Sequence, residues 1–90
     1  MKFRNDLILR RVGNEFLIVE PGNDAVDLSM VYSLNSSAAF IWTSLQGKDF
    51  DQDTIAELLI SEYGISPRSA FIDGEKILMQ FLSQKLVVID

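Results

Sequence analysis

The segment LNSSAAFIWTSLQG, residues 34–47, contains a complete set of helix signals. Asn35 or Ser36 at its start can accept a hydrogen bond from an unpaired amide of the first helical turn. Its apolar residues recur at the spacing of one helical face, namely Ala38, Ile41, Trp42 and Leu45. Gly47 is well placed to end the helix. The segment therefore predicts a helix whose buried face carries the only tryptophan of the chain.

Two short aliphatic runs precede this helix, at residues 7–12 and 16–20. A Gly-Asn pair at residues 13–14 lies between them, and such a pair between apolar runs is typical of a β-hairpin. A two-residue turn there would place Leu9 opposite Ile18 and leave apolar side chains on both faces of the hairpin. One face can cover the helices, and the other then needs some further cover.

Two more helices follow the opening segment. The second begins near Asp51 or Asp53 and ends at Gly64. Its predicted buried stripe consists of Ile55, Leu58, Leu59 and Tyr63. The third begins after Ser66, with Pro67 at its first position. Its stripe consists of Ala70, Ile77, Leu78 and Phe81, broadened by Phe71, Ile72, Met79 and Leu82.

These elements predict a single α+β domain over residues 1–90. An N-terminal β-hairpin and a short third strand at residues 30–34 precede three helices, which is the outline of a winged helix-turn-helix-like fold. Residues 86–90 suit a terminal strand or an apolar tail. Gly74 lies inside the third helix at a cost on the order of 1 kcal/mol relative to alanine, which indicates the close approach of a neighbour or a bend.

Composition narrows the classes of partner. The chain has 8 basic and 13 acidic residues and a net charge of -5, which disfavours nucleic acid and anionic membranes as partners. The third helix region carries Arg68, Lys76 and Lys85 against Asp73 and Glu75, which is a poor surface for phosphate. Because the chain has neither a secretory signal nor an apolar run long enough to span a membrane, we expect a cytoplasmic protein.

The sequence contains no histidine and no cysteine, which excludes Ser-His-Asp triads, Cys-His pairs and the usual zinc sites. Asp49, Asp51 and Asp53 alternate like the start of a calcium loop, but Thr54 and Ile60 stand where that loop needs glycine and glutamate. We expect these aspartates to cap the second helix instead. The predicted domain is not an enzyme and holds no catalytic residue, metal or cofactor.

The order LN, AAFIW, L.G, an acidic second helix ending in EYGIS, then Asp73 and FL resembles the PqqD-like family, the relatives of pyrroloquinoline quinone biosynthesis protein D. The similarity spans residues 34–86. The chain departs from the family pattern at Ser37 and Lys85, and at Gly74, where an aliphatic residue is usual. The resemblance implies a domain that holds the leader of a ribosomally made precursor peptide. Such domains present the peptide's core to a modifying enzyme, often a radical S-adenosylmethionine protein, and do no chemistry themselves.

The resemblance also implies where the leader binds. In the family it adds as an extra strand beside the third strand, along the third helix, and strand addition draws affinity from main-chain hydrogen bonds and specificity from side-chain pockets. On this chain the candidate peptide-binding residues are Met30, Val31, Tyr32 and Ser33 of the strand and Arg68, Phe71, Ile72, Glu75, Lys76 and Met79 of the helix. Proline at Tyr32 is expected to abolish binding because it removes a donor.

Three alternatives stay open at this point. Phe71 and Ile72 suit the hydrophobic core as well as a binding surface, since a broad apolar stripe usually packs inward. The domain outline also fits a winged-helix DNA-binding regulator, whose affinity for DNA would depend strongly on salt. Finally, the chain fits a general interaction module whose exposed hairpin mediates homodimerisation.

Overall fold

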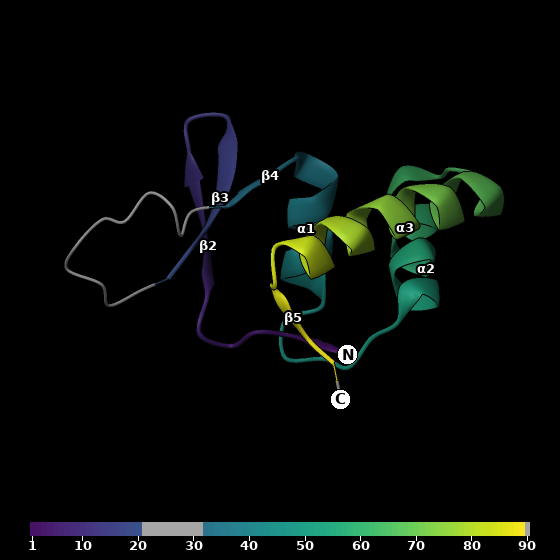
Figure 1. Cartoon of the computed structure of the whole chain (residues 1–90). Helices are drawn as coiled ribbons and strands as arrows, with labels where there is room; N and C mark the ends of the chain where they lie inside the picture. Colours follow the sequence, from purple (N-terminus) through teal and green to yellow (C-terminus); the bar gives the residue numbers. More distant parts are fainter. Residues whose placement is uncertain (21–31, 90) are drawn as a thin grey trace.

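The computed structural model of the chain describes residues 1–20 and 32–89. Its elements are β1 (Lys2–Phe3), β2 (Ile8–Val12), β3 (Glu15–Val19), β4 (Tyr32–Leu34), α1 (Ser36–Ser44), α2 (Gln52–Tyr63), α3 (Pro67–Ser83) and β5 (Val87–Val88). Strands β2, β3 and β4 form one antiparallel sheet with β3 in the centre, and β1 pairs with β5. Figure 1 shows the β2–β3 hairpin at one end of the molecule and the helices at the other. The predicted α+β arrangement is confirmed.

Only part of the predicted third strand falls within the described residues. This part comprises Tyr32–Leu34, and the predicted strand positions Met30 and Val31 lie outside the described residues. In the part of the chain that the structure describes, no helix is long and apolar enough to cross a membrane.

The β2–β3 hairpin has the predicted register. Gly13 takes a φ of 62°, which the first central position of a II′ turn requires and glycine adopts without strain. Leu9 pairs with Ile18 as expected. Ile18 is fully buried against the helices, whereas Ile8 and Val12, on the other face, are exposed.

Side-chain caps fix where each helix begins. Asn35 accepts a hydrogen bond from the Ala38 amide at 2.8 Å, and Ser66 accepts one from the Ser69 amide at 3.2 Å. Helix α2 ends at Gly64, as predicted, with a φ of 64°. Helix α1 ends at Ser44, so the predicted end at Gly47 is wrong. A short turn follows the helix, and Gly47 in this turn has a φ of 73°.

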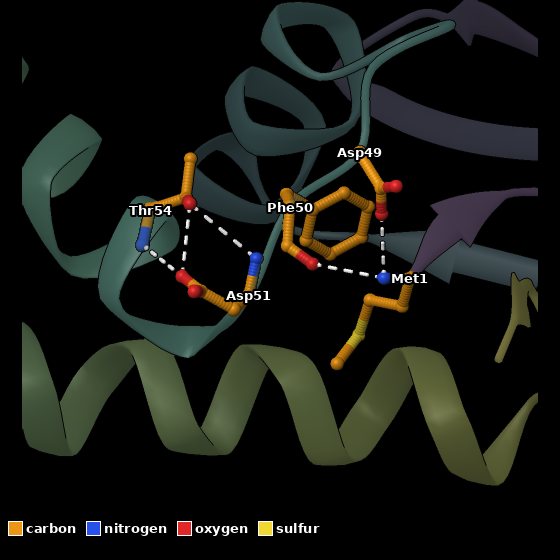
Figure 2. A network of polar contacts seen from close by, with 5 residues as sticks. All are labelled: Met1, Asp49, Phe50, Asp51 and Thr54. Atoms are coloured by element: carbon orange, nitrogen blue, oxygen red, sulfur yellow. Dashed lines mark hydrogen bonds and ion pairs between the residues drawn. The ribbon is translucent and has the colours of Figure 1, made fainter. Parts of the chain in front are cut away.

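Figure 2 shows the start of α2. The Asp51 carboxylate accepts hydrogen bonds from the backbone N–H and from the hydroxyl of Thr54, both at 2.9 Å, and these bonds lower the pKa of Asp51. The Met1 amino group donates to Asp49 at 2.8 Å and lowers the pKa of that carboxyl. Asp53 lies in the first turn, where its charge complements the helix dipole. Asp51 and Asp53 therefore serve the start of α2, as the sequence indicates. The expectation is wrong for Asp49, whose carboxylate pairs with the Met1 amino group instead of capping the helix.

An aromatic cluster lies at the centre of the hydrophobic core. The ring of Phe3 lies 4.4 Å from that of Trp42 and 4.7 Å from that of Phe50, between centroids. Phe81 meets Phe3 edge-on at 4.9 Å. The predicted core residues Trp42 and Phe81 are confirmed. The sequence did not indicate β1 as the partner of β5 or Phe3 and Phe50 as core residues.

Helices α2 and α3 pack closely at Gly74. A Cβ atom on this glycine would lie 3.2 Å from the Ile55 Cγ2 atom and 3.6 Å from the Ala56 amide nitrogen. Helix α3 continues through this position without a break. Of the two predicted reasons for a glycine here, the close approach of a neighbour is therefore the correct one.

Tyr63 is not buried, which corrects the predicted stripe of α2. It is 47% exposed because it is the last residue of α2, one turn beyond the buried Leu59. Its ring packs edge-on against Phe40, with 5.9 Å between the centroids. Phe40 is half-buried against the core and, through this contact, links α1 to the end of α2.

Candidate functional site

The register of the β2–β3 hairpin fixes the direction of the backbone groups of β3. A two-residue turn makes Val12 and Glu15 a hydrogen-bonded pair, and such pairs alternate with non-bonded pairs along an antiparallel ladder. Leu17 therefore directs its N–H and C=O towards β2. Phe16 and Ile18, one position away on either side, direct theirs towards β4.

The same alternation continues into β4. Tyr32 pairs with Ile18, so its backbone groups face β3, whereas Ser33 pairs with Leu17. Ser33 consequently turns its backbone N–H and C=O away from the sheet, to the outward edge of β4. An outward edge of this kind is a template for another strand.

Helix α3 lies beside this outward edge. The side-chain amide of Gln80 donates a hydrogen bond to the Ser33 carbonyl oxygen at 3.2 Å, across 47 positions of sequence. This contact agrees with the register, since only an outward carbonyl can reach α3. Gln80 was not among the predicted site residues, because nothing in a helical pattern reveals a partner so far away in the chain.

The six predicted residues of α3 are all exposed, namely Arg68, Phe71, Ile72, Glu75, Lys76 and Met79. The exposed fraction is 47% for Phe71, 44% for Ile72 and 61% for Met79. The alternative that places Phe71 and Ile72 in the core is therefore wrong. The core face of α3 consists instead of Ala70, Gly74, Ile77, Leu78 and Phe81.

These exposed residues do not all lie on the same side of α3 as Gln80. At about 100° per residue, Lys76 lies about 40° from Gln80 around the helix axis, and Ile72 and Met79 lie about 80° and 100° away. Arg68 and Glu75 are farther round, and Phe71 is about 180° from Gln80.

The Gln80–Ser33 contact joins β4 to α3, and Ile72, Lys76 and Met79 are the predicted residues of α3 that lie within about 100° of Gln80 around the helix axis. We define the β4–α3 edge as Tyr32, Ser33, Ile72, Lys76, Met79 and Gln80. Tyr32 is half-buried on the helix-facing side of the sheet, and Ser33 is exposed on the opposite face.

An open pocket lies at one end of this edge. It has a volume of about 420 Å³ and lies between the start of α1, the end of α2 and α3. The pocket is lined by Asn35, Ser36, Ser37, Leu59, Tyr63, Ile65, Asp73, Lys76 and Ile77. Lys76 belongs to both the pocket and the β4–α3 edge, so a chain that leaves the edge near α1 would meet a mixed apolar and charged surface.

The chemistry of this surface suits binding. Within residues 1–20 and 32–89, no group of three or more acidic residues is arranged to hold a metal ion, and the buried side chains are apolar. The β4–α3 edge offers outward main-chain groups, exposed apolar side chains and one cation. The main-chain groups can pair with the backbone of an extended peptide, and the side chains can recognise its residues.

Comparisons with known proteins agree with this arrangement. The family model described as coenzyme PQQ synthesis protein D matches residues 15–87. Among solved structures, the chain is similar to the one described as TbiB1 in complex with the TbiA(beta) leader peptide, with a TM-score of 0.69, 15% sequence identity and 100% of each chain covered. At this identity the likeness shows a shared fold. Comparison with curated protein sequences gave no match.

Proposed function

The chain belongs to the family of coenzyme PQQ synthesis protein D (PqqD), and from that premise we propose that it binds the leader of a ribosomally made precursor peptide. The leader adds as a strand to the outward edge of β4 and lays its side chains against α3. The domain presents the rest of the peptide to a modifying enzyme of the radical S-adenosylmethionine class and performs no chemistry itself. The shared fold of TbiB1, which is described with a leader peptide bound, supports this proposal.

The orientation of Ser33 is the observation that carries the proposal. Its N–H and C=O face away from β3, towards α3. A peptide strand that lies along β4 can exchange main-chain hydrogen bonds with this residue whatever its own sequence. The outward N–H of Ser33 therefore supplies affinity, and selectivity has to come from side chains.

We assign that selectivity to three side chains of α3. Ile72 and Met79 are exposed apolar groups that a bound peptide would cover, and each loses contact with water when it does. Lys76 lies between Ile72 and Met79 along the helix and closer than either to Gln80 around its axis. Its positive charge favours a leader with an acidic residue at the matching position. Phe71, on the far side of α3, would be reached only by a peptide that wraps over the helix.

Replacement of Ser33 by proline tests the strand-addition mode. Proline removes the outward N–H and places a ring on the edge, yet it leaves the β3–β4 hydrogen bonds intact because those belong to Tyr32 and Leu34. We expect affinity for a synthetic leader peptide that the wild type binds to fall about tenfold or more. Isothermal titration calorimetry with the synthetic leader measures it.

Ser33→Ala is the matched control, because it removes the side chain and keeps the N–H, so its affinity should equal that of the wild type. Proline at Tyr32 is the poorer test, since the Tyr32 N–H faces β3 and its loss would disrupt the sheet itself. If a folded Ser33→Pro variant bound the leader as tightly as Ser33→Ala does, strand addition at β4 would be refuted.

A further inference from the structure

The outward carbonyl of Ser33 already has a partner in the free protein. The donor is the Gln80 side-chain amide, at 3.2 Å. A glutamine amide N–H is chemically equivalent to a peptide N–H as a hydrogen-bond donor. Gln80 therefore makes the bond that a backbone N–H of an added strand would make.

We propose that Gln80 is a placeholder that caps the outward edge of β4 until a leader strand replaces it. This inference rests on the proposed function. The arriving strand delivers a main-chain N–H to the Ser33 carbonyl, and the glutamine amide turns away to water.

The structure allows this exchange at small cost. The bond between Gln80 and Ser33 is exposed, so a released glutamine amide can hydrogen-bond to water at once. The Gln80 backbone stays fixed, since its carbonyl accepts hydrogen bonds from the Gln84 amide at 3.1 Å and the Ser83 hydroxyl at 2.9 Å. Only the side-chain rotamer of Gln80 has to change.

The consequence is an affinity threshold. Since one amide donor replaces another, the new bond to the Ser33 carbonyl adds little net binding free energy. Every arriving strand has to break the Gln80–Ser33 bond, and the free energy of breaking it is the same for each peptide. A peptide that offers only an extended backbone therefore binds most weakly. A peptide whose side chains also fit α3 overcomes that cost. The cap likewise satisfies an edge that would otherwise be open to strands of other proteins.

Gln80→Met removes the donor at nearly the same side-chain length, and Gln80→Ala removes it without adding an apolar group. We expect both variants to bind the synthetic leader about two- to fivefold more tightly than the wild type does. The matched control is Gln46→Met, an exposed position in the turn after α1, whose affinity should not change. Calorimetric titration of each full-length variant gives the values.

Thermal unfolding separates the placeholder from a merely structural residue. Loss of the Gln80–Ser33 bond should leave the free variants equally stable or slightly less stable while their affinity rises. A structural role would lower stability and affinity together. If the wild type binds the leader and both Gln80 variants bind it equally well or more weakly, the proposal that Gln80 is a placeholder is refuted.

A third measurement addresses the exchange itself. In ¹⁵N-labelled protein, the Gln80 side-chain amide signals, identified by their loss in Gln80→Met, should move towards those of exposed Gln46 when the leader saturates the protein. If they keep their free-state position while the Ser33 amide shifts, the carbonyl serves both donors and the proposal fails. Absence of leader binding by the wild type and by every variant would instead refute the proposed function.

Discussion

Both faces of α3 carry large apolar side chains, but these have different surroundings. Ile77 and Phe81 lie against the core, and Gly74 admits α2 to within van der Waals contact. Ile72 and Met79, on the other side, remain exposed. A large apolar side chain therefore does not by itself show whether its position on α3 holds the fold together or is free to bind. The presence or absence of a packed neighbour does.

The largest expected effect comes from breaking the buried face. Phe81 is fully buried and meets Phe3 and Trp42, so Phe81→Ala leaves a cavity and should lower the free energy of unfolding by about 3–5 kcal/mol. Urea denaturation followed by tryptophan fluorescence measures it. Met79→Ala, on the exposed face, is the control and should stay within about 0.5 kcal/mol of the wild type. Similar losses in the two variants would contradict the division of α3 into two faces.

An intermediate effect is expected at the exposed face, on binding rather than on stability. Met79→Ala should weaken leader binding by about fivefold to tenfold, because it removes apolar area that the peptide would cover beside β4. Phe71→Ala removes another exposed apolar group, about 180° from Gln80, and should leave affinity unchanged. Fluorescence anisotropy of a labelled leader compares them. A larger loss for Phe71→Ala would move the binding surface to the other side of α3.

The smallest effect concerns the helix that packs on the buried face. The hydrogen bonds from Thr54 lower the pKa of Asp51 in the folded protein, so the charged carboxylate stabilises α2 at pH values above the ordinary aspartate pKa. This stabilisation is lost as the pH falls through the lowered pKa, below about pH 4. Asp51→Asn keeps a capping oxygen but cannot ionise.

Urea denaturation over a pH series checks this prediction. The wild type should lose more stability on acidification than Asp51→Asn does, and the difference between the two curves isolates Asp51 from the other carboxylates. Parallel curves would show that the cap contributes nothing through its charge.

Local signals in the sequence predicted most of the fold. Gly13 and Asn14 fixed the hairpin register, and Asn35, Asp51 and Ser66 fixed the helix starts, because turns and caps depend on a few adjacent residues. Pairing of β1 with β5 was missed, since strands of two residues have no periodicity to detect. For the same reason Phe3, which lies in β1, gave no sign of its place in the core.

The candidate site was predictable only in part. The resemblance led to β4 and α3, and the exposure of Ile72 and Met79 agrees with a surface role. Helical spacing could not decide between core and surface for Phe71, because that depends on where α2 packs. Gln80 was out of reach altogether, since its partner Ser33 lies in another element and contributes a backbone atom, which leaves no trace in the sequence.

The burial of Trp42 has a practical optical consequence. As the only tryptophan, almost fully enclosed and 4.4 Å from the ring of Phe3, it is the sole indole whose emission the protein contributes. That emission reports whether the core is intact, and it does not sample the solvent beside Ser33 or Met79. A dye on the peptide is therefore the appropriate reporter of binding. One sample can then yield two independent signals, with the intrinsic emission reporting folding and the dye reporting occupancy.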